Sequence, residues 1–312
     1  MRILDNAWKR GELREETVVT IGNFDGLHRG QRAILERLDE RARGRPKVMV
    51  TFEPHPLAVL RPGRAPARLT TVEQKEELIR GAGIDVLAIV RFTVEFSQTT
   101  ARRFVEDLLF DRLRAREVVV GSRFTFGRER EGNLGLLHEL GAELGFEVDG
   151  VEELERGGAR VSSTRIRQTI VDGRVAEAGD LLGRPYAVRG RVRSGAGAGR
   201  RLGFPTLNIE LESEILPGDG VYATRTLLRN DGRIVDSVSN VGKRPTLHDD
   251  AVSSLECHLM GFEEDAYGCP VEVEFHERLR SEQKFTNIGE LSTQIGRDVV
   301  AAREYFAALG CS

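Results

Sequence analysis

Residues 199–208 read Gly-Arg-Arg-Leu-Gly-Phe-Pro-Thr-Leu-Asn, a stretch that is too irregular for a buried element yet rich in polar groups. Its glycines permit close backbone approach, and its proline stiffens the turn. Thr206 and Asn208 then present neutral oxygens two residues apart on an extended segment. Such oxygens, together with substrate phosphates and water, are common ligands of Mg²⁺. Taken alone, the stretch also fits a plain Gly/Pro turn between two strands.

Short apolar strands separated by turns surround this stretch in the second half of the chain. They are expected at 188–192, 221–227, 234–241, 255–259 and 271–275. A last helix is expected because apolar residues between Ile288 and Phe306 recur at helical spacing. Many short strands with intervening turns predict an antiparallel β-barrel, here followed by a terminal helix.

The first half of the chain instead alternates strands with helices. Strands are expected at 18–21, 47–52, 85–90, 117–120 and 146–151, and helices at 72–79, 99–113 and 134–144. This alternation predicts an α/β, Rossmann-like fold with a parallel sheet and helices on both faces. Ligands of such sheets bind beyond the carboxyl ends of the strands. We place the domain boundary so that residues 1–183 form the α/β domain and residues 184–312 form the barrel domain.

The composition narrows the class of protein. A chain of 312 residues with 40% hydrophobic residues is long enough for two domains with real cores. With a net charge of −3, the chain lacks the excess of basic residues that is typical of proteins that bind nucleic acid. No apolar run is long enough to cross a membrane. Three cysteines without Cys-x-x-Cys spacing predict neither a disulfide framework nor a zinc site. We therefore expect a soluble, cytoplasmic protein, whose oligomeric state the sequence does not specify.

A second polar stretch, Gly22 to Gln31, lies where the first strand meets a helix. Free N–H groups and the dipole at a helix N-terminus attract phosphate. His28 and Gln31 are three residues apart and so share a helix face, with Gly30 between them leaving room for a ligand. The sole Gly-Lys pair of the chain is followed by Arg244, which excludes a P-loop. His28 is therefore predicted to contact phosphate in a site of another type.

Several segments together resemble bacterial FAD synthetases of the nucleotidyltransferase superfamily, whose signature is His-x-Gly-His. They are Gly22–Gln31, Thr51–Pro56, Val120–Gly121 with Phe124–Gly127, and Arg160–Arg167. The resemblance implies that His28 is the catalytic group at the ATP phosphates. It implies further ATP contacts from Gly22, Phe24, Gly30, Gln31, Arg160, Ser163 and Thr164. It also implies that the flavin is bound near Asn23, His55, Pro56 and Arg123.

Two residues depart from the pattern of that family. Gln31 stands where the signature has its second histidine, and Arg123 stands where the family usually has Asn or Asp. Gln31 can still donate a hydrogen bond, but it carries no charge. Loss of one charge-stabilising donor typically lowers a rate by about 10²–10³-fold. Arg123 either restores positive charge from another loop or blocks the flavin.

The second half of the chain is similar to riboflavin kinases over nearly all of residues 184–312. The similarity is carried by residues 199–209, 220–223, 240–246, 255–259 and 280–285. It implies that Glu256 is the general base that takes a proton from the ribityl 5′-hydroxyl. It implies that Thr206 and Asn208 hold Mg²⁺ on ATP. It further implies a phosphate flap that contains Gly195, Gly199 and Arg200, and a flavin contact from Arg280.

The leading hypothesis is a bifunctional enzyme that uses Mg²⁺ and ATP. Its C-terminal domain would phosphorylate riboflavin to FMN, and its N-terminal domain would adenylylate FMN to FAD with release of pyrophosphate. One alternative, motivated by Gln31 and Arg123, is a riboflavin kinase whose other domain is impaired or uses another nucleotide. A second alternative is a flavin-binding protein without catalysis. The expected partners are riboflavin, FMN, FAD and ATP, with no nucleic acid and no membrane.

Overall fold

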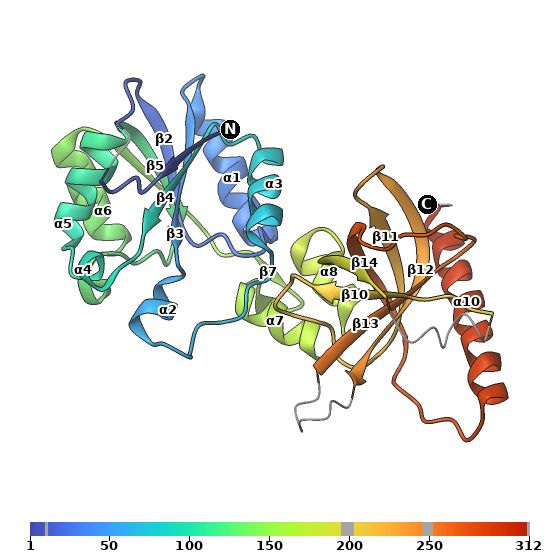
Figure 1. Ribbon diagram of the computed structural model, residues 1–312. Coiled ribbons are helices and arrows are strands. Elements are labelled where there is room, and N and C mark those ends of the chain that lie inside the picture. The colour runs from blue at the N-terminus through green and yellow to red at the C-terminus, as the bar shows by residue number, and fades with distance from the viewer. Residues whose placement is uncertain (10–11, 195–202, 245–251, 311–312) are drawn as a thin grey trace. The chain divides into compact units, whose positions relative to one another are not determined.

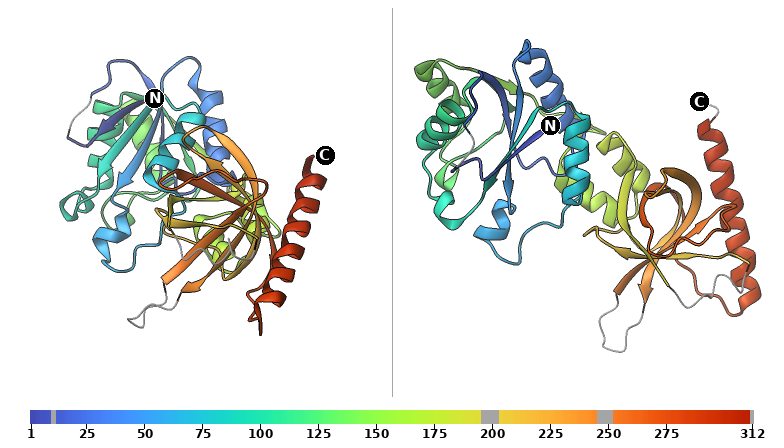
Figure 2. Two further views of the ribbon diagram at one scale, coloured as in Figure 1. Left: turned by 45° about the vertical axis from the view of Figure 1, so that its right-hand side comes forward. Right: turned by 45° about the horizontal axis from the view of Figure 1, so that its top comes forward.

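The computed structural model describes residues 1–9, 12–194, 203–244 and 252–310. The chain forms two compact units, which are drawn from three directions in Figures 1 and 2. The first unit comprises Met1–Ala67 and Val72–Ser162, and the second comprises Arg68–Thr71 and Ser163–Ser312. No helix within the described ranges is long and apolar enough to span a membrane.

A parallel sheet forms the centre of the first unit. Across the sheet lie β1 (Arg2–Asp5), β4 (Val86–Arg91), β3 (Lys47–Glu53), β2 (Thr17–Ile21), β5 (Ala115–Gly121) and β6 (Glu147–Val151). Every neighbouring pair is parallel, which confirms the predicted sheet. The central strands are apolar runs with buried side chains, as a sheet covered on both faces requires. The sequence does not predict edge strand β1, because its polar residues leave only Leu4 buried.

Helices cover both faces of this sheet (Figure 1). α1 (Arg29–Ala42) and α3 (Val72–Gly81) lie over one face, where Leu38 and Ile79 are buried. The other face is covered by α5 (Ala101–Phe104), the π-helix η1 (Val105–Arg112) and α6 (Leu134–Leu144). The helix predicted over 99–113 is therefore α5 continued by η1. The shorter elements are α2 (Pro56–Leu60), α4 (Val94–Ser97), the 3₁₀ turn η2 (Arg128–Arg130) and the hairpin of β7 (Glu155–Arg156) with β8 (Ala159–Arg160).

A closed antiparallel barrel forms most of the second unit. Around the barrel lie β10 (Leu207–Leu211), β13 (Val252–Leu259), β12 (Arg233–Arg244), β11 (Gly220–Leu228), β14 (Pro270–Arg280) and β9 (Tyr186–Arg193), which pairs again with β10. The terminal helix α10 (Ile288–Gly310) packs outside the barrel, where Val299 and Phe306 meet Val221 and Val238. The predicted barrel with a terminal helix is thus confirmed.

Two helices precede the barrel and pack with it. α7 (Ser163–Val171) and α8 (Val175–Leu182) contact each other, and α8 contacts β9 and β14. Both helices belong to the second compact unit, whose longer segment begins at Ser163. The sequence instead suggests a boundary between residues 183 and 184, where the helical pattern gives way to short strands.

Small hydroxyl side chains fill part of the barrel interior. Thr224 Oγ1 lies 2.8 Å from Ser237 Oγ and 2.7 Å from Ser239 Oγ. The Ser239 hydroxyl donates to Cys257 Sγ at 3.1 Å, and burial raises the pKa of the Cys257 thiol to about 12. Side chains alternate between the two faces of a strand. Since Cys257 points into the barrel, its neighbour Glu256 lies on the outer face.

Candidate active sites

The turn that follows β2 has an unusual backbone conformation. Phe24 and Leu27 have φ values of 46° and 41°, and both side chains are buried. Positive φ is rare for such residues and persists only where packing fixes it. A Cβ on Gly22 would come within 3.2 Å of the Phe24 ring, so glycine lets the ring fold back over the turn. Packing of the Phe24 and Leu27 side chains therefore holds the turn that is predicted to bind phosphate.

His28 begins helix α1 as its N-cap. Its ring Nδ1 accepts a hydrogen bond from the Gln31 backbone N–H (3.3 Å), and its own N–H donates to Gln31 Oε1 (3.1 Å). This reciprocal pair is a capping box. Because Nδ1 accepts, the neutral ring carries its proton on Nε2, which can donate to an anion. A Cβ on Gly30 would lie 3.3 Å from Nδ1, so Gly30 lets the ring lie over the start of the helix.

The capping box gives Gln31 a role that the sequence analysis missed. The carboxamide oxygen of Gln31 accepts from the His28 N–H, whereas a protonated imidazole has no acceptor to offer there. The departure from the His-x-Gly-His signature therefore has a structural function at the start of α1. The three-residue spacing of His28 and Gln31 is the signal for a capping box, but histidine is not among the preferred cap residues.

Asn23 and His55, both predicted to lie near the flavin, meet from two different loops. Asn23 Nδ2 lies 3.2 Å from His55 Nε2. His55 also caps α2, because its Nδ1 accepts from the Leu57 N–H (3.1 Å), and Pro56 occupies the first turn of that helix. Lys75 on α3, which the sequence analysis did not single out, donates to the Asn23 carbonyl oxygen at 2.7 Å.

The two predicted arginines of the first unit share one carboxylate. Glu153 Oε2 lies 3.2 Å from Arg123 Nε, and Glu153 Oε1 accepts from Arg160 Nη1 at 2.6 Å. The Arg123 side chain is 75% exposed. Glu153 therefore orients Arg123, a predicted flavin contact, together with Arg160, a predicted phosphate contact. The remaining predicted phosphate contacts of this half, Ser163 and Thr164, begin α7 in the second unit.

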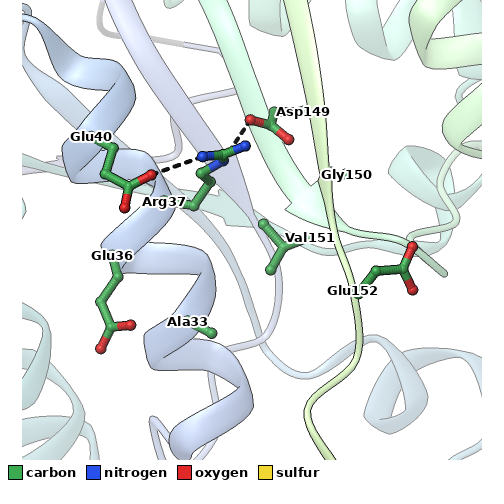
Figure 3. A pocket seen from close by; sticks show the side chains of 8 residues that line it. All are labelled: Ala33, Glu36, Arg37, Glu40, Asp149, Gly150, Val151 and Glu152. Atoms are coloured by element: carbon green, nitrogen blue, oxygen red, sulfur yellow. Dashed lines mark hydrogen bonds and ion pairs between the residues drawn. The ribbon is translucent and has the colours of Figure 1, made fainter.

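A cavity of about 330 Å³ lies between α1 and β6 (Figure 3). Its charged lining residues are Glu36, Arg37, Glu40, Asp149 and Glu152. Carboxylates outnumber the guanidinium, and an anionic lining repels phosphate. None of the predicted site residues is among its described lining residues. We therefore do not assign the nucleotide to this cavity.

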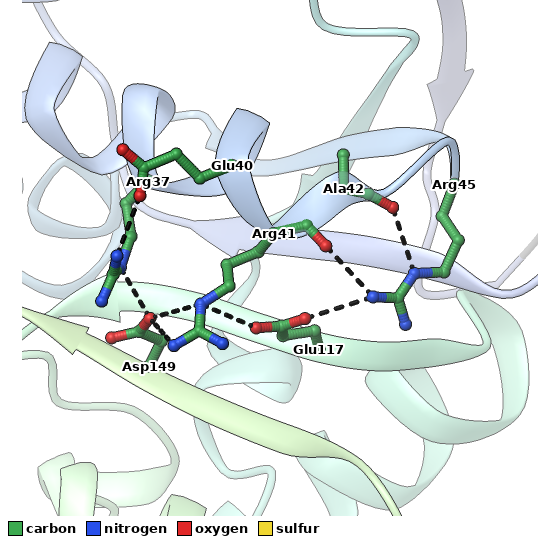
Figure 4. A network of polar contacts seen from close by, with 7 residues as sticks. All are labelled: Arg37, Glu40, Arg41, Ala42, Arg45, Glu117 and Asp149. Atoms are coloured by element: carbon green, nitrogen blue, oxygen red, sulfur yellow. Dashed lines mark hydrogen bonds and ion pairs between the residues drawn. The ribbon is translucent and has the colours of Figure 1, made fainter.

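Ion pairs anchor α1 to the sheet (Figure 4). The Glu117 carboxylate on β5 is 2% exposed and lies 3.2 Å from Arg41 Nε and 3.2 Å from Arg45 Nη2. Asp149 on β6 lies 2.8 Å from Arg37 Nε and 2.7 Å from Arg41 Nη2. A buried carboxylate is tolerated when it is paired in this way. These contacts fix the position of α1 and therefore of His28 at its start.

On the outer face of the barrel, the strand register aligns predicted kinase residues in one row. Asn208 on β10 lies directly opposite Glu256 on β13, and Glu256 lies opposite Asn240 on β12. The row continues through Val221 on β11 to Arg280 on β14. Directly opposed residues have Cβ atoms about 4.5–5.5 Å apart. Glu256 is thus flanked by two carboxamides, of which the sequence analysis predicts Asn208 but not Asn240.

His258 supports the turn that carries Thr206. Its Nδ1 lies 2.9 Å from the Pro205 carbonyl oxygen and donates to it, and its ring meets the Phe204 ring edge-on at a centroid distance of 5.5 Å. Thr206 precedes Asn208 by two residues, so both face the same side of the extended segment. The predicted flap residues Gly195, Gly199 and Arg200 lie outside the described residues.

Arg280, a predicted flavin contact, is held by the terminal helix. Its Nε donates to Asp298 Oδ1 (2.9 Å) and its Nη2 donates to Asp298 Oδ2 (2.8 Å). The two side chains are 15% and 5% exposed. The guanidinium also lies 5.8 Å from the centroid of the Phe285 ring. This pair fixes the end of β14 to α10 beside the outer row.

Replacing Asp298 by alanine is expected to destabilise the second unit by about 3 kcal/mol, because it leaves a largely buried guanidinium without its carboxylate. Thermal unfolding followed by circular dichroism measures the change as a lowered Tm. The matched control is Asp231→Ala, which removes the exposed partner of Arg233 and should change Tm little. Equal shifts in the two variants would contradict a stabilising role for the Arg280–Asp298 pair.

The oxygens on the outer face suit a hard cation. The Thr206 hydroxyl and the Asn208 carboxamide lie on the side of the Glu256 carboxylate, and Mg²⁺ is held by such oxygens together with phosphates and water. In the part of the chain that the structure describes, no group of three or more His, Cys, Asp or Glu residues gathers to hold a metal. The donor set therefore fits a cation that arrives with a nucleotide.

Known proteins resemble the chain over both halves. The FAD synthetase family matches residues 11–165, and the riboflavin kinase family matches residues 182–306. The bifunctional riboflavin kinase/FMN adenylyltransferase of Escherichia coli K12 is 41% identical over 295 residues, which are 94% of this chain and 94% of that protein. The chain belongs to this bifunctional family. The Haemophilus influenzae member is 35% identical and covers 98% of this chain and 99% of its own length.

A solved structure shares the fold of this family member. It is the crystal structure of a Streptococcus pneumoniae protein named as a macrolide-efflux protein, with a TM-score of 0.89 and 30% identity. The likeness covers 96% of this chain and 98% of that chain. The bifunctional family thus accounts for both units, with His28 and Arg160 in the FAD synthetase region and Glu256 in the riboflavin kinase region.

Proposed function

We propose that the chain phosphorylates riboflavin to FMN with MgATP at residues 184–312, and adenylylates FMN to FAD at residues 1–183 with release of pyrophosphate. The observation that carries this proposal is the row on the barrel in which Glu256 lies between Asn208 and Asn240. It sets a carboxylate beside an oxygen donor suited to a nucleotide-bound cation. The names of the curated relatives support the same two activities.

Glu256 is the proposed general base of the first reaction. The nucleophile is the neutral 5′-hydroxyl of the ribityl chain, which must lose a proton as its oxygen bonds to the γ-phosphorus of ATP. Glu256 takes that proton, the bond from phosphorus to the β,γ-bridging oxygen breaks, and ADP leaves. Asn208 and Asn240 lie opposite Glu256 on the two neighbouring strands, where their carboxamides would orient the carboxylate and the hydroxyl.

Thr206 and Asn208 are the residues that would hold Mg²⁺ beside the ATP phosphates. Bound there, the cation would offset negative charge on the transferring group. His258 supports the arrangement by donating to the Pro205 carbonyl oxygen, which holds the turn that carries Thr206 just before β10. The predicted flap of Gly195, Gly199 and Arg200 remains part of the proposal as a cover for the phosphates.

The second reaction requires positioning rather than a base. The phosphate of FMN is already an anionic nucleophile; its oxygen bonds to the α-phosphorus of ATP, and the bond to pyrophosphate breaks. His28 donates from Nε2 to the phosphates at the start of α1, next to the N–H groups of the helix terminus. Arg160, Ser163 and Thr164 complete the proposed phosphate contacts, and Asn23, His55, Pro56 and Arg123 the flavin contacts.

Replacing Asn208 by alanine is expected to raise the Mg²⁺ concentration needed for half-maximal FMN formation by about tenfold, because one oxygen ligand is lost. Titration of Mg²⁺ against initial rates at saturating ATP and riboflavin measures the change. Adenylylation of FMN by the same variant is the internal control and should keep its Mg²⁺ dependence. An unchanged Mg²⁺ requirement of the kinase step would count against Asn208 as a ligand.

A second candidate is a riboflavin kinase whose first unit is impaired or accepts a nucleotide other than ATP. The capping role of Gln31 and the pairing of Arg123 with Glu153 favour it, since both residues differ from the family pattern. We further propose that the protein acts in the cytoplasm, where thiols stay reduced, because Cys257 and Cys269 are free and buried.

A chromatographic product assay tests the proposed function. The purified full chain is incubated with riboflavin and MgATP, and separately with FMN and MgATP, and FMN and FAD are quantified over time. Formation of FMN in the first mixture and FAD in the second supports the bifunctional enzyme. FMN without FAD supports the second candidate, and a screen of other nucleotides follows. Tight flavin binding without either product would refute both.

A further inference from the structure

Lys75 connects the two loops that carry the predicted flavin contacts of the first unit. Its Nζ donates to the Asn23 carbonyl oxygen at 2.7 Å and to Thr51 Oγ1 at 2.8 Å. The Thr51 hydroxyl lies 3.3 Å from the same carbonyl oxygen, and Thr51 is buried. Asn23 follows β2 and Thr51 belongs to β3, the neighbouring strand. One ammonium group on α3 therefore joins the carboxyl ends of two adjacent strands.

The Asn23 side chain extends this connection to His55. His55 Nδ1 accepts from the Leu57 N–H, so the neutral ring must carry its proton on Nε2. Nε2 faces the Asn23 carboxamide at 3.2 Å. Two donors cannot bond to each other, so the hydrogen-bond network requires the Asn23 amide to be turned over, with Oδ1 rather than Nδ2 facing the Nε2–H. The Leu57 N–H and the Asn23 carboxamide together favour this tautomer of His55, and Asn23 fixes the orientation of its ring from the other side.

We propose that Lys75 is a positioning residue for adenylyl transfer, acting through Asn23 on His55. Its ammonium fixes the Asn23 peptide, and the Asn23 carboxamide fixes the ring and proton of His55. This inference rests on the proposed adenylylation of FMN, in which His55 is assigned to the flavin. Thr51 contributes by holding the ammonium from the strand side.

The strength of the contacts supports an effect on rate. Hydrogen bonds from a charged donor are shorter and stronger than neutral ones, as the 2.7 Å contact of Lys75 illustrates. A displacement of about 1 Å in a positioning group can lower a rate by about 10²-fold. Lys75→Met is therefore expected to lower kcat for FMN adenylylation by about 10–100-fold. Lys75→Arg, which keeps the charge and the donors, should restore most of the rate.

The test combines kinetics with the ring spectrum of His55 in the full chain. Histidine labelled with ¹⁵N is incorporated, and His55→Gln assigns the His55 signals by their loss. Wild-type protein should show His55 as a single tautomer with its proton on Nε2. In Lys75→Met and in Asn23→Ala the ring should shift towards a mixture of tautomers. Arg80→Met, which removes an exposed cation from the same helix, should leave both spectrum and rate unchanged.

The outcomes separate this inference from the proposed function. Unchanged His55 signals in both Lys75→Met and Asn23→Ala would overturn the inference, whatever happens to the rate. Altered signals with a kcat loss, a smaller change in KM and unchanged riboflavin phosphorylation would support it. If wild-type protein makes no FAD, the proposed function of the first unit fails, and the positioning of catalysis by Lys75 fails with it. If Lys75→Met does not fold, the His55 spectrum of Asn23→Ala and the adenylylation rate of Lys75→Arg test the inference instead.

Discussion

Replacing Glu256 by glutamine is expected to lower the rate of FMN formation by about 10³-fold, within the range attributed to a general base. Glutamine has nearly the shape of glutamate, but it cannot accept the proton of the ribityl hydroxyl. Glu256 lies between Asn208 and Asn240, so a carboxamide there stands between two other carboxamides. The barrel should therefore fold normally and still bind riboflavin.

Initial rates at saturating MgATP and riboflavin measure the effect of Glu256→Gln. Glu263→Gln, at an exposed position of the same unit, is the matched control and should retain full activity. Adenylylation of FMN by Glu256→Gln should also remain at the wild-type rate, because Glu256 is assigned to the kinase reaction alone. Equal loss of both activities would refute the assignment of the two reactions to separate sets of residues.

The second large effect is expected at His28. Replacing it by asparagine should lower FMN adenylylation by about 10²–10³-fold, because a donor at the phosphates is lost. Asparagine is a strongly preferred N-cap residue, so it can replace His28 Nδ1 as the acceptor for the Gln31 N–H. Stability should then be close to that of the wild type. His28→Ala removes the cap as well and should cost about 1 kcal/mol in the free energy of unfolding.

This pair of variants separates the two roles of His28. Chemical denaturation measures stability, and conversion of FMN with MgATP measures activity. An active His28→Asn variant would show that His28 serves only as the cap of α1. In both variants the phosphorylation of riboflavin should be unchanged, since His28 and the kinase row belong to different units.

The sequence predicted both folds because the spacing of apolar residues within each segment indicates whether that segment forms a strand or a helix. Apolar runs such as residues 47–52 and 117–120 became β3 and β5 of the parallel sheet. The exception, β1, is a polar edge strand whose position depends on pairing with β4, which periodicity does not reveal. The change from α5 to the π-helix η1 has no counterpart in the helical spacing of apolar residues over 99–113.

The candidate sites were predicted less completely, because their supporting residues are distant in the sequence. Glu256 and Asn208 were found from motifs, but Asn240 needed the register of β12 against β13. Three predicted site residues are held by partners that lie in other segments, namely Lys75, Glu153 and Asp298. The spacing of residues within one segment cannot predict such contacts. The sequence shows that Gln31 departs from the His-x-Gly-His signature. Its hydrogen bond with the His28 N–H could be recognised only once the structure showed that α1 begins after His28.

The central claim, that two separate sites act in sequence, is tested most directly by mixing two inactive variants. Riboflavin and MgATP are given to Glu256→Gln alone, to His28→Asn alone, and to an equimolar mixture, and products are followed chromatographically. We expect little product from the first, FMN without FAD from the second, and FAD from the mixture as free FMN passes between molecules. A mixture that forms no FAD, although each variant keeps its other activity, would contradict this account.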